Sequence, residues 1–402
     1  MSKLISCPGC GLNLEVDSGA NPADFLCPEC GARLRRPPAR PGGGGSRRRR
    51  DDDDEEIDWR LLGGAAAATL AVLALAYVLF VAIPGRKDPL VQADRAAPAH
   101  DDRAAGNPRS ETPPPGNPSS RDPFLLPDAR RNFVTNLRGD APAREPIDSP
   151  PPDVFQIVKF RSPVGELAAY LTPDPADGRK RPAIIWITGG DCNSIGNVWR
   201  TAPRDNDQTA AAYRKAGIVM MFPSLRGGNE NPGRREGFLG EVDDVIAAAE
   251  HLAAQSYVDP NRIYLGGHST GGTLAMLVAA SSNRFRATFA FGPVDDVRGY
   301  GGQFVYHEPG DRREDTLRSP TYWLPSVQTP LFVIEGSGGN IECLQSMKAK
   351  TSNPSVRFVP IYGKDHFNIL APANEIIAAK ILADTGESCD IALSEQELKG
   401  GR

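Results

Sequence analysis

Residues 266–272 read Gly-Gly-His-Ser-Thr-Gly-Gly and decide the fold of the C-terminal part of this chain. The preceding run, Arg-Ile-Tyr-Leu-Gly (262–266), predicts a strand, and the apolar run at 273–280 predicts a helix. The glycines permit a sharp turn between them, because a Cβ there would collide with the neighbouring strand and helix. Such a turn strains the backbone of Ser269 and holds its hydroxyl clear of the sheet, as a nucleophile requires.

Strands and helices are expected to alternate on both sides of this turn, over residues 153–386. Buried apolar strands interleaved with helices predict a mostly parallel sheet covered on both faces. Together with the Gly-x-Ser-x-Gly turn, this pattern predicts an α/β-hydrolase fold. The expected strands are 154–160, 166–171, 183–188, 217–222, 262–266, 286–291, 331–335 and 356–361, and the expected helices are 208–215, 236–255, 273–280 and 372–384. Residues 293–325 interrupt the alternation and are expected to form a cap or lid near the site.

A serine nucleophile needs a histidine to take its proton, and in this fold the base follows the last strand. His366 stands there, in Gly-Lys-Asp-His-Phe (363–367), and is the predicted base. His268 lies inside the elbow and is expected to pack or to shape the pocket. The remaining histidines fall in other segments: His100 in the proline-rich tether, His251 in a helix and His307 in the expected lid.

An oxyanion hole needs two donors aimed at the developing negative charge. The backbone N–H of Thr270, directly after the nucleophile, is one candidate. The other is expected in the glycine-rich loop 189–193 after the strand at 183–188, with Gly190 as the first choice and Asp191 as the alternative.

The N-terminal head carries two Cys-x-x-Cys pairs, each followed by glycine, at Cys7, Cys10, Cys27 and Cys30. Four thiolates at this spacing predict a tetrahedral structural zinc site, with disulfides or a redox pair as the alternative. Residues 1–36 are therefore expected to be a zinc ribbon that depends on its metal for folding. No cofactor is expected for catalysis, and whether the ribbon binds a protein partner is left open.

Residues 61–83 carry no charge and are long enough, at about 1.5 Å per residue, to cross a hydrocarbon core of about 30 Å. A single transmembrane helix is predicted there, after a charged linker at 37–60. Lysine and arginine favour the cytoplasmic side, and their bias around the span is modest. It predicts a cytoplasmic N-terminus and an extracytoplasmic C-terminal domain. The basic residues on the two sides are Arg47, Arg48, Arg49, Arg50 and Arg60 before the span, and Arg86, Lys87 and Arg95 after it.

Residues 84–152 are proline-rich and are expected to be a disordered tether, and residues 387–402 a tail. The formal net charge of −4 gives no electrostatic argument for a nucleic-acid partner. If the large domain is extracytoplasmic, its cysteines meet an oxidising space, and Cys343–Cys389 is the expected bridge if one forms.

Three segments resemble the catalytic domain of the prolyl oligopeptidase family (peptidase family S9). Residues 222–228 are similar to its Arg-Gly loop, and residues 240–244 to the start of the following helix. Residues 257–272 are similar to its Val-Asp-Pro-x-Arg-Ile…Gly-x-Ser-x-Gly-Gly signature. The resemblance covers about residues 180–385 and implies a Ser-Asp-His triad acting on peptide or ester bonds.

Two features depart from that family. Its peptidases usually carry a β-propeller before the hydrolase domain, whereas here a tether and a membrane span precede it. The loop after the strand at 331–335, where the family places its aspartate, holds none. Glu342 is the preferred acid, and Glu335 and Asn340 are the alternatives.

These observations predict a membrane-anchored serine hydrolase, either a peptidase or an esterase, that forms an acyl-enzyme at Ser269. The second hypothesis is a degenerate hydrolase domain that serves as an extracytoplasmic binding or sensor module. The missing aspartate is its main support, and the presence of both Ser269 and His366 speaks against it.

Overall fold

A computed structural model describes residues 2–6, 13–17, 125–138 and 145–399 of the 402-residue chain, which divides into two compact units, Met1–Asn117 and Pro118–Arg402. In the first unit, β1 (Ser2–Ser6) pairs antiparallel with β2 (Asn13–Asp17), so that Ser6 lies opposite Asn13. The predicted zinc ligands lie outside the described residues; these are Cys7, Cys10, Cys27 and Cys30. Within the described ranges, no cluster of His, Cys, Asp and Glu is arranged to hold a metal ion.

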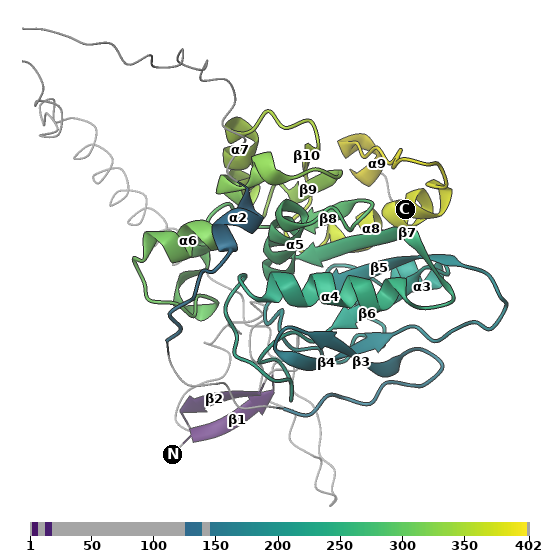
Figure 1. Ribbon diagram of the computed structural model, residues 1–402, viewed down its shortest axis with the longest axis horizontal. Coiled ribbons are helices and arrows are strands. Elements are labelled where there is room, and N and C mark those ends of the chain that lie inside the picture. Colours follow the sequence, from purple (N-terminus) through teal and green to yellow (C-terminus); the bar gives the residue numbers. More distant parts are fainter. Residues whose placement is uncertain (1, 7–12, 18–124, 139–144, 400–402) are drawn as a thin grey trace, which may run out of the picture. The chain divides into compact units, whose positions relative to one another are not determined.

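The second unit is built on an eight-stranded sheet with the order β10-β9-β8-β7-β5-β6-β4-β3 (Figure 1). Neighbouring strands from β6 to β10 along this order are parallel, and β4 is antiparallel to both β3 and β6. The predicted mostly parallel sheet is thus confirmed. Its strands are β3 (Gln156–Ser162), β4 (Gly165–Leu171), β5 (Arg181–Ile187), β6 (Val219–Pro223), β7 (Val258–His268), β8 (Thr288–Phe291), β9 (Leu331–Gly336) and β10 (Val356–Ile361).

Helices cover both faces of this sheet, as expected. Alternate residues of β5 enter two different cores, because successive side chains of a strand point to opposite faces. Buried side chains of α4, α5 and α7 fill one core, and those of α3, α8 and α9 fill the other. These helices are α3 (Ala211–Lys215), α4 (Glu241–Ala253), α5 (Thr270–Ser281), α7 (Ile341–Lys350), α8 (Leu370–Ala383) and α9 (Glu395–Lys399).

The interruption expected at 293–325 is an insertion between β8 and β9. It holds α6 (Arg312–Arg318) and short 3-10 helices at Val297–Gln303, Pro320–Tyr322 and Leu324–Ser326. The hydroxyl of Tyr300 in this insertion lies 2.8 Å from Oγ1 of Thr273 on α5. The insertion therefore contacts the helix that follows the elbow.

The prediction of a disordered tether over 84–152 is wrong for residues 125–138. Helix α2 (Leu126–Arg130) lies there and buries Leu126 completely and Ala129 almost completely. These apolar side chains pack in the same core as α5, so a proline-rich composition did not prevent docking. The compact unit begins at Pro118, and the domain boundary at 153 was accordingly placed too late.

The C-terminal segment is also part of the domain rather than a free tail as far as residue 399. Ile391 and Leu398 are buried against the core that α8 covers. Cys343 and Cys389 are free thiols, so the expected bridge is absent. Cys343 lies on α7 beyond the carboxyl end of β9, whereas Cys389 lies beside the first residues of β7, at the amino ends of the parallel strands.

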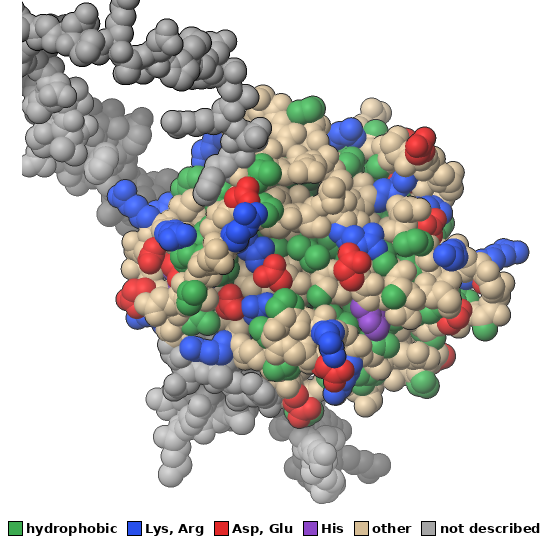
Figure 2. Space-filling model, viewed as in Figure 1, with side chains coloured by type: hydrophobic (Ala, Val, Ile, Leu, Met, Phe, Trp, Pro, Cys, Tyr) green, Lys and Arg blue, Asp and Glu red, His purple; other side chains and the backbone are tan. Residues whose placement is uncertain are grey.

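Among the residues that the structure describes, no helix is both long and apolar enough to cross a membrane. The predicted span at 61–83 lies outside those residues. On the face shown in Figure 2, basic and acidic side chains lie interspersed rather than gathered by sign.

Candidate active site

Ser269 occupies the turn between β7 and α5 with φ 53° and ψ −114°. A positive φ is uncommon for a residue other than glycine and costs on the order of 1–3 kcal/mol, so the surroundings must hold it. The backbone N–H of Ser269 donates to the carbonyl of Phe291 (2.8 Å), and the N–H of Thr273 donates to the carbonyl of Ser269 (2.9 Å). The predicted strand–turn–helix is thus confirmed, with Ser269 partly exposed at its apex.

The glycines beside Ser269 are needed for close backbone contacts. A Cβ on Gly267 would lie 2.4 Å from the carbonyl oxygen of Gly271. A Cβ on Gly271 would lie 2.3 Å from the carbonyl oxygen of Ile187, at the end of β5. Both distances are far below van der Waals contact. A side chain on Gly267 would therefore push β7 and the start of α5 apart, and one on Gly271 would push the elbow away from β5.

His366 lies in the loop between β10 and α8, as predicted for the base. Its Nδ1 lies 2.9 Å from Oε2 of Glu335, near the end of β9. The Glu335 side chain is fully buried, and that of His366 is 16% exposed. Because a carboxylate accepts hydrogen bonds, this contact places a proton on Nδ1 and leaves Nε2 of a neutral imidazole as the acceptor.

The preference for Glu342 as the acid is corrected by this contact. Glu342 is exposed in the first turn of α7, whereas the carboxylate of Glu335 also accepts from the backbone N–H groups of Gly336 (2.7 Å) and Asn340 (3.0 Å). Asn340, the third candidate, contacts Glu335 through its backbone N–H, and its side chain donates to the carbonyl of Gly292 (2.9 Å). The loop after β9 thus folds back over a side chain that starts inside the strand.

Gly292 provides the space for the His366–Glu335 pair. It has φ +58°, and a Cβ on it would lie 2.4 Å from Cε1 of His366 and 2.9 Å from Oε2 of Glu335. Its conformation and its lack of a side chain are therefore both required at this position.

The two predicted oxyanion donors belong to neighbouring segments. The hydroxyl of Thr270 donates to the carbonyl oxygen of Gly190 (2.8 Å), which ties the start of α5 to the loop after β5. Gly190 has φ +74°, a conformation that glycine adopts without strain. The structure thus brings Thr270 and Gly190 together beside Ser269.

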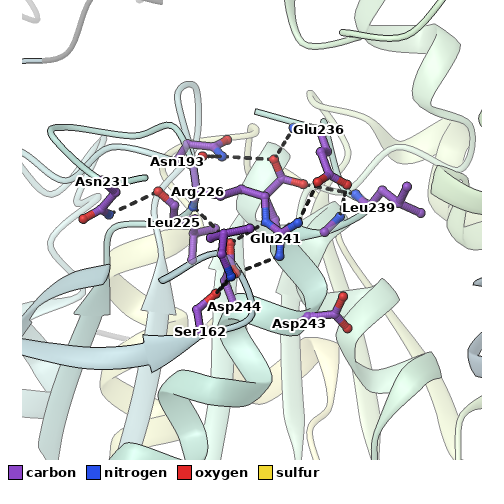
Figure 3. Close-up of polar contacts among 12 residues, drawn as sticks. Ser162, Asn193, Leu225, Arg226, Asn231, Glu236, Leu239, Glu241, Asp243 and Asp244 are labelled. Atoms are coloured by element: carbon purple, nitrogen blue, oxygen red, sulfur yellow. Dashed lines mark hydrogen bonds and ion pairs between the residues drawn. The ribbon is translucent and has the colours of Figure 1, made fainter. Parts of the chain in front are cut away.

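A buried polar cluster supports the glycine-rich loop 189–193, which was expected to supply an oxyanion donor (Figure 3). The side-chain amide of Asn193 donates to Glu241 (3.1 Å) and to the carbonyl of Arg226 (2.8 Å). Arg226 donates through Nε and Nη2 to Asp244, each at 2.9 Å, and the Asp244 side chain is fully buried. Burial raises the pKa of Glu241, which also accepts from the backbone N–H of Glu236 (2.7 Å). Hydrogen bonds therefore join the segments 222–228 and 240–244 to each other and to Asn193 in this loop.

Two side chains near the site were missed as contributors. Tyr300 contacts Thr273 through its hydroxyl, and burial raises its pKa, so the phenol stays protonated. Gln208 contacts both Gly189 and His268. Neither lies in a recognisable motif; the only sequence signal was an aromatic residue among glycines at 299–302 for Tyr300.

The arrangement contains the parts of acyl-transfer chemistry. A strained serine stands on the elbow, a histidine is oriented by a buried carboxylate, and a glycine loop approaches from the neighbouring strand. This constellation can activate a hydroxyl for attack on a carbonyl carbon.

Comparison with known proteins gives similarities over parts of the chain. It is 36% identical over 107 residues to the dual function macrocyclase-peptidase POPB of Galerina marginata, covering 24% of this chain and 15% of that protein. It is 24% identical over 233 residues to dipeptidyl-peptidase 5 of Porphyromonas gingivalis, covering 52% and 33%. A solved puromycin-hydrolyzing peptidase of Mycobacterium tuberculosis has a TM-score of 0.48 at 18% identity, covering 59% of this chain and 40% of that chain.

The chain thus spans a third or less of the length of these two curated relatives. The sequence profile of the prolyl oligopeptidase family matches residues 205–338. This range includes the Arg-Gly loop, the elbow with Ser269, and Glu335. This part of the chain is therefore similar to the prolyl oligopeptidase family.

Proposed function

We propose that this protein is a serine hydrolase in which Ser269, His366 and Glu335 form the catalytic triad. The observation that carries the proposal is the 2.9 Å contact between His366 and the buried Glu335, in a domain whose elbow presents Ser269. The contact supplies the oriented base that a serine nucleophile needs.

The reaction proceeds through an acyl-enzyme. Ser269 Oγ attacks the carbonyl carbon of the substrate while Nε2 of His366 takes its proton, and Glu335 stabilises the resulting imidazolium. The backbone N–H groups of Thr270 and Gly190 donate to the developing oxyanion. His366 then protonates the leaving amine or alcohol, and water, deprotonated by the same nitrogen, releases the acid and regenerates Ser269.

The proposed substrate is a peptide, with an ester as the alternative, because both pass through the same acyl-enzyme. The similarity to the prolyl oligopeptidase family and the peptidase names of the relatives favour a peptide. Peptide and ester substrates of matched acyl group would separate the two by their kcat/KM values.

The sequence further supports an anchored arrangement. The uncharged run at 61–83 would cross the membrane once, with the zinc ribbon of residues 1–36 in the cytoplasm and the hydrolase domain outside. A membrane-impermeant protease applied to intact cells should remove the hydrolase domain and spare the ribbon. Cobalt bound to the head should give a thiolate charge-transfer band if the four cysteines hold the metal.

The alternative, a degenerate hydrolase domain that only binds or senses a ligand, has lost its main support. It rested on the missing aspartate, and Glu335 places a buried carboxylate on His366 instead. A glutamate is an accepted acid in α/β-hydrolase triads.

Alanine variants at Ser269 and at His366 test the proposal. Each should abolish hydrolysis of activated esters and peptides while retaining the wild-type circular dichroism spectrum, because the triad acts as one unit. Wild-type turnover by either variant would overturn the assignment.

A further inference from the structure

Three hydrogen bonds in series connect segments around the candidate site. Oε1 of Gln208 accepts from the backbone N–H of Gly189 (3.2 Å). Nε2 of the same amide lies 2.8 Å from Nδ1 of His268, and Nε2 of His268 lies 2.9 Å from the carbonyl oxygen of His366. The series thus joins the glycine-rich loop 189–193, the residue before the nucleophile, and the loop that carries the base.

The backbone groups at the two ends of this series determine which atom donates in each hydrogen bond. The carbonyl of His366 only accepts, so Nε2 of His268 must carry a proton. Nδ1 of the neutral ring then accepts, and the Gln208 amide must turn its NH2 toward it. If the Gln208 amide were reversed, its NH2 would face the N–H of Gly189, and two donors cannot form a hydrogen bond. All three contacts are therefore consistent with one arrangement of protons.

His268 is suited to remain uncharged in this place. It is 1% exposed, and burial, followed by the nearby His366, lowers its pKa to about 3. Its ring centroid lies 4.5 Å from that of His366 and 5.5 Å from that of Phe367. The ring therefore packs against the base loop in addition to its hydrogen bond.

We propose that Gln208 and His268 are positioning residues that hold the Gly189–Gly190 loop and the His366 loop in register with Ser269. This inference rests on the proposed function of the site. His268 fixes the backbone of His366 while Glu335 fixes its ring, and Gln208 extends the same link to the glycine-rich loop. Displacements on the order of 1 Å at a catalytic group can cost about 100-fold in rate, so loosening this link should be visible in turnover.

Substitutions that remove the link test its effect on catalysis. Gln208→Leu and His268→Leu should each lower kcat by about 10- to 100-fold with little change in KM, since neither side chain is assigned to substrate binding. The double variant should lose less than the product of the two single effects, because both act through one series. His268→Gln, whose amide can donate to the His366 carbonyl, should recover most of the turnover.

Gln255 provides a matched control. Its Nε2 lies 3.2 Å from Nε2 of His251 on α4, which is another partly buried glutamine–histidine pair outside the catalytic loops. Gln255→Leu makes the same chemical change and should retain wild-type kcat. The proposal is overturned if Gln208→Leu and His268→Leu are as active as Gln255→Leu, or if His268→Gln is as slow as His268→Leu.

A spectroscopic measurement tests the link without any assay of activity. In ¹⁵N-histidine-labelled full-length protein, His268 should stay neutral, with its proton on Nε2, between about pH 5 and 8. An imidazolium or an Nδ1-protonated ring would contradict the proposal even if every variant folded poorly. If the wild type shows this tautomer but does not react at Ser269, the proposed function fails while the hydrogen-bond series stands.

Discussion

Glu335 and His366 are joined by a 2.9 Å contact between Oε2 and Nδ1, although Glu335 belongs to strand β9 and not to the loop that follows it. The same carboxylate accepts from the backbone N–H of Gly336, the last residue of β9, and from that of Asn340 in the loop. The proposed acid is thus held in part by the loop in which the acid was expected. The side chain of glutamate is longer than that of aspartate, and this allows Glu335 to reach His366 from the strand, before the loop in which an aspartate was expected.

Glu335→Gln should lower kcat/KM by about three to four orders of magnitude, as loss of the orienting charge does in serine proteases. Glu342→Gln is the control, because Glu342 is exposed on α7 and should have no effect. Hydrolysis of an activated ester would measure both variants. Equal losses in the two variants, or a larger loss at Glu342, would contradict the assignment of Glu335.

Gly292→Ala should reduce kcat by about 100-fold or more. The Cβ of alanine would displace the His366 ring, and alanine would be strained at the positive φ of this position. Gly299→Ala is a suitable control, since a Cβ there would come no closer than 3.7 Å to Val294. Steady-state kinetics of both variants provides the measurement. A fully active Gly292→Ala protein would show that the His366–Glu335 geometry tolerates displacement.

Asp244→Ala should lower the free energy of unfolding by about 3–5 kcal/mol, because it leaves the guanidinium of Arg226 buried without its main partner. Asp243→Ala, at the adjacent position, removes a carboxylate that is 44% exposed and pairs with Arg130, and should cost about 1 kcal/mol or less. Urea denaturation of the two proteins would separate these values. Similar losses would mean that burial does not govern the Arg226 cluster.

The lowered pKa of His268 predicts a pH dependence of stability. Its pKa is about 3 in the folded protein and about 6.5 for an ordinary histidine, so the unfolded chain binds more protons between these values. The stability contribution is complete above about pH 6.5 and is lost as the pH falls toward about 3. His268→Gln should therefore lose stability less steeply over this range than the wild type. Parallel stability curves would contradict a neutral, buried His268.

The elements around the candidate site could be predicted where local pattern and fold geometry agree. The structure confirms the strand, turn and helix around Ser269 and the loop after the last strand that carries His366. Glu342 was preferred to Glu335 because Glu342 lies after the glycine-rich part of the loop, whereas Glu335 was expected to lie in the strand. The contact between His366 and Glu335, and the fold of residues 337–340 that brings the Asn340 N–H to the same carboxylate, could not be predicted from the local sequence pattern.

Contacts between distant segments could not be predicted from the sequence. Gln208 and His268 are 60 residues apart in the sequence, and no local pattern indicates that their side chains meet. Residues 125–138 were assigned to a disordered tether by their composition, yet Leu126 fits a buried site beside α5. In both cases, tertiary packing outweighs the local signal.

Covalent capture at Ser269 tests the central claim most directly. The full-length protein would be treated with a fluorophosphonate, which forms a bond to an activated serine oxygen and expels fluoride, and then analysed by intact-mass and peptide mass spectrometry. The account predicts one adduct on the wild type, located on Ser269, none on Ser269→Ala, and strongly slowed labelling of His366→Ala. A wild-type protein that acquires no adduct, or that is modified at another serine, would contradict it.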